Sequence, residues 1–192
     1  MSTMLVVGSA PCLHDDIARA LELRPFAATM LVNGACSAVE SAEHVLSGHT
    51  DNAEMYADAR RKAFPNAQPW RLHATVAEKH RNDAQKVFPS VTDWWGKEMC
   101  TGATSVAKGV RIAFALGATE VILCGAPMDA SGYVPTEAKV RHYCHRVGDP
   151  AAQKFRVIEG YRTKFKKLAE TEFKGKVWSM SGFTRACLGE PR

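Results

Sequence analysis

Residues 101–129 read TGATSVAKGVRIAFALGATEVILCGAPMD, which predicts a helix, a buried strand and a loop in direct succession. Small and hydroxyl-bearing residues open the helix, Val106 and Val110 recur on one face, and Gly117 is placed to end it. Residues 121–124 are all apolar, which is typical of a strand that is buried on both faces. A helix followed by such a strand is the repeating unit of a parallel sheet covered by helices.

The same alternation runs through the rest of the chain, without an internal repeat or a linker that would divide it. We therefore predict one doubly wound α/β domain over residues 1–192, Rossmann-like and with a mostly parallel sheet. The paired tryptophans in 91–96 are predicted to lie in a loop, and 181–192 to form a tail. Strands are expected near 4–7, 28–32, 44–46, 70–72, 121–124 and 176–180, and helices near 15–23, 36–42, 52–64, 101–116 and 151–173.

The composition is that of an ordinary globular protein. Its 192 residues are 46% hydrophobic, enough for one core, which excludes a disordered, collagen-like or coiled-coil chain. No stretch approaches the roughly 20 apolar residues of a membrane span, and the first residues do not resemble a secretory signal, so we expect a soluble, cytoplasmic protein. The six cysteines are scattered without a C-x-x-C pair, which predicts reduced thiols.

The formal net charge of +5 is unevenly distributed along the chain. Residues 1–100 contain ten Lys or Arg against twelve Asp or Glu, and the remainder contains 15 against 8. Most of the excess lies in 139–176. This basic segment is either a solvated helix face or a surface that faces phosphate, from a small nucleotide or from DNA.

Polar and small residues follow the predicted strands, at the edge where open parallel sheets bind ligands. Each has a local explanation, as a turn residue or as a helix cap. Together they favour a nucleotide-type ligand, because small residues and helix starts accommodate phosphate. The candidate nucleotide-binding residues are Gly8, Ser9, Asn33, His49, Thr101, Gly102 and Gly125.

The candidates for acid and base chemistry are Asp129, His142 and His145. The two histidines have Arg141 and Arg146 as neighbours, and these positive charges disfavour the protonated imidazole. A zinc site is not expected, because His142 and His145 lack further ligands at a familiar spacing. The chain also has no D-x-D pair, no G-x-S-x-G elbow and no P-loop, so we predict no metal, no serine-hydrolase site and no P-loop chemistry.

Four short motifs carry a family resemblance: Leu5-Val-Val-Gly-Ser-Ala-Pro11, Leu31-Val-Asn-Gly34, Thr101-Gly-Ala103 and Val121-Ile-Leu-Cys-Gly-Ala-Pro-Met-Asp129. In this order they resemble small bacterial CMP-sialic-acid-dependent sialyltransferases, whose fold is a variant of the GT-A type. They also resemble the related family that includes archaeal 6-hydroxymethylpterin diphosphokinases. Similar chains, with an ending like that of residues 179–189, occur in phages.

The resemblance implies that Gly8, Ser9, Asn33, Thr101 and Gly102 hold the nucleotide. It also places His49 where the transferases make a polar contact to the donor. Two departures stand out. The first turn reads G-S-A-P-C instead of G-x-G-P-S-L, and the stretch 154–159 has no histidine where the transferases have their general base.

The leading hypothesis is a nucleotide-dependent transferase, specifically a metal-independent glycosyltransferase that takes a nucleotide-activated sugar as substrate and needs no cofactor. One alternative is a phage-type protein that faces nucleic acid, acting in DNA modification or its control, with residues 139–176 contacting DNA. Another is a nucleotide-binding protein without catalysis. The donor nucleotide, the acceptor and the oligomeric state, including a homo-oligomer, are left open.

Overall fold

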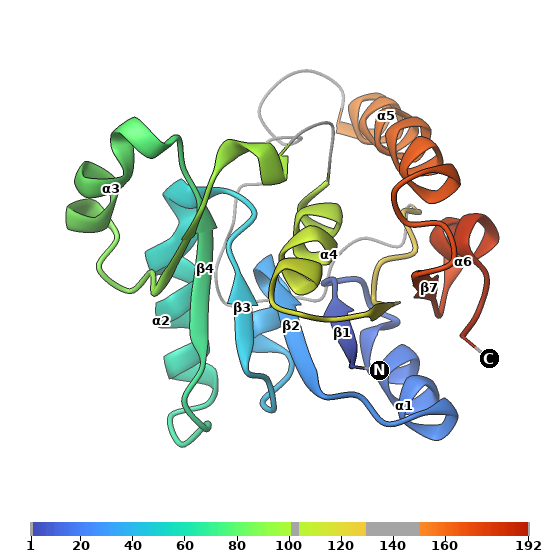
Figure 1. Ribbon diagram of the computed structural model, residues 1–192, viewed down its shortest axis with the longest axis horizontal. Helices are drawn as coiled ribbons and strands as arrows, with labels where there is room; N and C mark the ends of the chain where they lie inside the picture. The colour runs from blue at the N-terminus through green and yellow to red at the C-terminus, as the bar shows by residue number, and fades with distance from the viewer. Residues whose placement is uncertain (1, 101–103, 130–149, 192) are drawn as a thin grey trace.

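The computed structural model describes residues 2–100, 104–129 and 150–191, the side chains of 150–157 excepted, and its centre is one seven-stranded sheet (Figure 1). The strand order is β5-β4-β3-β2-β1-β6-β7, and every pairing is parallel. The predicted α/β class is confirmed, and the described sheet is parallel throughout. The strands are β1 Thr3–Val7, β2 Ala28–Val32, β3 His44–Leu46, β4 Arg71–Thr75, β5 Asp93–Trp95, β6 Glu120–Cys124 and β7 Val177–Ser179.

Helices connect the strands, as parallel pairing requires. Short 3-10 turns at Asn33–Ser37 (η1), Thr50–Asn52 (η2), Glu78–His80 (η3) and Lys97–Cys100 (η4) complete the connections. The α-helices are α1 Leu13–Leu23, α2 Ala53–Ala63, α3 Arg81–Val87, α4 Ser105–Ala115, α5 Pro150–Glu170 and α6 Gly182–Leu188.

The sheet has a hydrophobic core on each face. Leu5 and Val7 of β1 belong to a cluster that includes buried residues of α1 and α2. Met4 and Val6, which alternate with them, belong to the cluster of α4 and α5. Helices thus cover both faces (Figure 1), which explains why all five residues of β1 are buried and why residues 4–7 are all apolar.

The strand order reverses direction at β1, which pairs with β2 on one side and with β6 on the other. The helices that follow β1 and β6, α1 and α5, pack on opposite faces. In doubly wound sheets, ligands bind outside the carboxyl ends of the strands near such a reversal. The residues that follow β1, β2, β3 and β6 are therefore where this fold would place a ligand site.

Three local predictions were wrong. Residues 91–96 contain the edge strand β5, whose Trp94 and Trp95 pack against opposite core clusters as strand alternation demands. The predicted tail contains the helix α6, and the predicted helix over 36–42 is replaced by the 3-10 turn η1. All three segments are short, so contacts with the rest of the fold decide their conformation more than local periodicity does.

Candidate functional site

Three segments meet at Gly48, just beyond the carboxyl end of β3. The Gly48 amide donates to Asn33 Oδ1, which follows β2, over 2.7 Å. From the start of α4, Ser105 reaches so close that a Cβ on Gly48 would lie 2.1 Å from its Oγ. We call this set of residues, together with Lys108 of α4, the Gly48 corner. Gly48 has to be glycine because these neighbours leave no space for a side chain.

Asn33 has a structural task in this corner. Its φ of 54° is in the left-handed region, which asparagine tolerates better than most residues. Its side-chain oxygen holds the Gly48 amide, and its Nδ2 group stays a donor with no hydrogen bond to the described residues. The turn interpretation and the ligand interpretation of Asn33 are therefore compatible.

Lys108 is a residue of this corner that the sequence analysis missed. Its half-buried side chain extends from α4 and donates from Nζ to the Gly48 carbonyl over 2.7 Å. It lies three positions after Ser105, so both residues are on the same side of the helix. A lysine at this spacing after a hydroxyl-rich helix start was the sequence signal that could have identified Lys108. A lysine ammonium has three donors, so two are left for a ligand after the bond to Gly48.

His49, which the resemblance places in contact with the donor substrate, is exposed beside this corner. Partial desolvation lowers the pKa of its imidazole, the positive charge of Lys108 lowers it further, and Asp51 opposes both. At neutral pH the imidazole is therefore neutral. Thr104, next to the predicted Thr101 and Gly102, caps α4 by accepting from the Ala107 amide over 3.2 Å.

The ends of β1 and β6 are organised differently. A Cβ on Gly8 would lie 2.4 Å from the Gly125 carbonyl oxygen, and a Cβ on Gly125 would lie 2.5 Å from the Gly8 oxygen. Gly125 also has a φ of 58°. Close contact between the two backbones therefore accounts for both glycines without a ligand. Ser9, between Gly8 and Ala10, is half-buried.

A buried carboxylate, also missed in the sequence, ties this region together. Asp16 of α1 is 3% exposed, and its Oδ2 accepts from the Gly125 amide over 2.8 Å and from Ser181 Oγ over 2.6 Å. It thereby joins the residues that follow β6 and β7 to the first turn of α1. We call Gly8, Asp16, Gly125 and Ser181 the Asp16 junction.

The loop after β6 is braced by residues near the C-terminus. Thr184 Oγ1 donates to the Ala126 carbonyl over 2.8 Å, and the Phe183 amide donates to the Pro127 carbonyl over 2.9 Å. Arg162 of α5 donates from Nε to the Met128 carbonyl over 2.9 Å, and its guanidinium lies over the Phe183 ring. These bonds hold Met128 at a φ of 51°. Asp129, the next residue, is exposed.

Several predicted residues lie outside the described part of the chain. These are Thr101 and Gly102 of the nucleotide-binding set, the catalytic candidates His142 and His145, and the basic residues of 139–149. In the described part of the basic segment, Lys164, Lys166 and Lys167 are exposed on α5. Helix α5 lies on the β7 side of the sheet, and three strands separate β7 from β3 (Figure 1).

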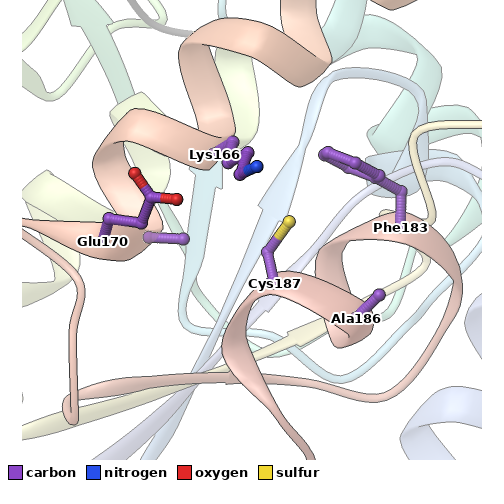
Figure 2. A pocket seen from close by; sticks show the side chains of 6 residues that line it. Lys166, Glu170, Phe183, Ala186 and Cys187 are labelled. Atoms are coloured by element: carbon purple, nitrogen blue, oxygen red, sulfur yellow. The ribbon is translucent and has the colours of Figure 1, made fainter.

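A pocket of about 330 Å³ lies between α5 and α6. Figure 2 shows Lys166 and Glu170 of α5 facing Phe183 and Cys187 of α6 across it. Burial raises the pKa of the Cys187 thiol, with Lys166 opposing, so the thiol is protonated at neutral pH. The five described cysteines are free thiols.

A histidine pair inside the sheet was also missed. His73 of β4 is fully buried, and its Nδ1 accepts from Trp95 Nε1 over 3.0 Å. Its Nε2 therefore carries the proton and donates to His44 Nδ1 over 2.9 Å. Burial lowers the pKa of His73 to about 4, although Asp93 opposes the shift. This pair is neutral and structural, since it lies among strands and away from their carboxyl ends.

The described residues include neither a metal-binding cluster nor a membrane-spanning helix. No group of three or more His, Cys, Asp or Glu side chains in this part of the chain is arranged to hold a metal ion. None of the described helices is long and apolar enough to cross a membrane.

Comparison with known proteins places the chain by its fold. No protein-family model and no curated protein matches the sequence. Among solved structures, the chain is similar to the sialyltransferase CstII from Campylobacter jejuni in complex with a substrate analogue, cytidine-5'-monophosphate. The TM-score is 0.61 at 12% identity, over 100% of this chain and 86% of CstII. The chain thus shares the Rossmann-like parallel fold of a CMP-sialic-acid sialyltransferase.

Proposed function

We propose that the protein is a nucleotide-dependent transferase, specifically a glycosyltransferase that uses a nucleotide-activated sugar without a metal. The convergence of Asn33, Ser105 and Lys108 at the Gly48 corner carries this proposal. It brings amide, hydroxyl and ammonium donors together at the sheet edge where doubly wound folds bind ligands. The fold likeness to CstII, whose structure contains a cytidine monophosphate, supports the same class of ligand.

In the proposed reaction, the bond between the sugar's anomeric carbon and a nucleotide phosphate oxygen breaks. An acceptor oxygen bonds to that carbon, and a base removes the acceptor's proton. Asp129 is the described base candidate, on the braced loop after β6. His142 and His145 are the other proposed bases, and Gly8, Ser9, His49, Thr101, Gly102 and Gly125 complete the proposed nucleotide set. Cationic side chains stabilise the departing phosphate in place of a metal.

A thermal-shift screen with CMP, UDP and GDP tests the first step. A nucleotide at 100 times its Kd stabilises the folded state by about 2.7 kcal/mol, which raises the Tm of a protein of this size by roughly 5–10 °C. Asn33→Gly keeps the left-handed backbone but removes the amide, so it should reduce the shift. Asn66→Ala, at an exposed site, is the matched control. If none of the three nucleotides shifts the Tm of the native protein, the proposal is wrong.

A second candidate function rests on Lys164, Lys166 and Lys167, which present an exposed cationic surface on α5. Such a surface fits a nucleic acid backbone, and binding would weaken steeply with salt. Neutralising the three lysines to glutamine should abolish DNA binding and leave nucleotide binding intact. Nucleotide binding without transfer to any acceptor in a panel would instead favour a non-catalytic nucleotide-binding protein.

A further inference from the structure

We infer that the phosphate of the bound nucleotide lies at Lys108 in the Gly48 corner, and not at the turn after β1 where dinucleotide-binding folds hold their phosphates. This inference rests on the proposed function and locates the contact between the nucleotide's phosphate and the protein. It leaves Gly8 and Ser9, which belong to the predicted nucleotide-binding set, without a contact to the phosphate.

Two amides of the turn after β1 are already bonded within the protein and cannot hold an anion. The Gly8 amide is bonded to the Cys124 carbonyl over 2.8 Å, the Ala10 amide is bonded to the Gly125 carbonyl over 3.1 Å, and Pro11 has no amide hydrogen. The carboxylate of Asp16 is buried within the first turn of α1, where a phosphate would otherwise benefit from the helix. A phosphate placed there would meet a fixed negative charge in a region of low dielectric.

The Gly48 corner has the opposite character. Lys108 supplies a half-buried positive charge whose position is fixed by its bond to the Gly48 carbonyl. Ser105 contributes a hydroxyl at the same point, and Asn33 contributes its Nδ2 donor. Charge-assisted hydrogen bonds are about twice as strong as neutral ones, and partial burial limits their screening.

The charged groups around Lys108 are consistent with this role. His49 is neutral at pH 7, because desolvation and Lys108 both lower the pKa of its imidazole. Asp51 is the acidic neighbour of His49 and has the effect of raising that pKa. An incoming phosphate would add negative charge beside His49, so nucleotide binding should raise the pKa of this imidazole.

The test compares each nucleotide that binds with its own nucleoside, by titration calorimetry on the whole chain. Lys108→Met should weaken nucleotide binding about tenfold or more and leave nucleoside binding unchanged, because the lost contact is to phosphate. Lys108→Arg should restore most of the affinity. Lys86→Met is the matched control, since Lys86 is exposed on α3, and it should bind as the native protein does.

A second measurement needs no variant. Limited acetylation of the native protein, read by mass spectrometry, should show that the nucleotide protects Lys108 and not Lys86, and that the nucleoside protects neither. Equal nucleotide affinity of Lys108→Met and the native protein, or equal loss of nucleotide and nucleoside binding, or acetylation of Lys108 unaffected by nucleotide, overturns this inference. In each of those results nucleotide binding by the native protein still stands, whereas failure of the proposed function appears as no binding at all.

Discussion

The Asp16 junction and the Gly48 corner lie at the same edge of one sheet, and they use their polar groups in opposite ways. In the Asp16 junction, the Gly125 amide and the Ser181 hydroxyl both donate to the Asp16 carboxylate. In the Gly48 corner, the internal bonds leave ammonium and amide donors available. Both regions have the sequence signature of small and hydroxyl-bearing residues after a strand. The difference teaches that tight backbone packing alone is enough to produce this signature.

The strongest way to break the Asp16 junction is Gly8→Ala. The added Cβ would lie 2.4 Å from the Gly125 oxygen, and backbone on both sides limits relaxation. We expect a loss of about 3 kcal/mol in the free energy of unfolding, measured by urea denaturation. Gly160→Ala in α5 has open space at its Cβ and is the matched control, with an expected gain of up to about 1 kcal/mol. Similar stabilities for the two variants would contradict the packing argument.

Asp16→Ala removes the acceptor at the centre of the junction. The Gly125 amide and the Ser181 hydroxyl then lose a buried partner, which should cost about 2 kcal/mol of unfolding free energy. Asp15→Ala is the control, because Asp15 occupies the same helix turn but is exposed. The same denaturation experiment reads both variants. An Asp16→Ala protein as stable as Asp15→Ala would show that the carboxylate contributes nothing to the junction.

Acid should affect the β3–β4 side before the Asp16 junction. The pKa of His73 is about 4 in the folded protein, against 6.5 for an ordinary histidine, so its unfolded form binds more protons between these values. Its contribution is fully present above pH 6.5 and is lost as the pH falls toward 4, by about 1–2 kcal/mol near pH 5.

Hydrogen exchange at pH 5 and pH 7, after correction for the intrinsic rate, locates this loss. The Ser47 amide, which donates to the His73 carbonyl over 3.0 Å, should lose more protection than the Gly8 amide. Equal losses at both amides would argue that acid acts on the sheet as a whole. His73→Gln should flatten the dependence of the unfolding free energy on pH.

Asn33→Gly should have the smallest effect on stability. Glycine accepts the φ of 54° without strain, and the loss is confined to one hydrogen bond to the Gly48 amide. We expect a change within about 1 kcal/mol in urea denaturation, far below that of Gly8→Ala. A loss as large as that of Gly8→Ala would mean that the Gly48 corner is as much a structural element as the Asp16 junction.

Much of the fold could be predicted from the chain because its strands are buried on both faces. The run that forms β1 and the stretch 101–129 carry continuous apolar residues and a clear helical stripe, so their type follows from local pattern. Strand β5 and helix α6 have three and seven residues, too few for periodicity to distinguish them from loop. Their conformations depend on hydrogen bonds to β4 and to the loop after β6.

The candidate site divides in the same way. Asn33 and His49 were predicted because both lie in turns that follow strands, and the ends of parallel strands share one edge. Lys108 and Asp16 were not, because both lie inside helices, where a charged residue is usually a solvated one. Their positions over Gly48 and Gly125 arise from how α4 and α1 pack on the sheet.

By itself, the sequence determined a parallel α/β sheet and the edge at which its polar loops lie. Continuous apolar runs indicate strands that are buried on both faces, and the order of strands and loops along the chain gives the strand direction. Tertiary structure decided in which of those loops the polar groups hydrogen-bond to one another and in which of them donors stay available. Hydrogen bonds between residues more than one hundred positions apart, such as that of Asp16 to Gly125, have no local signature. They form where distant segments pack together.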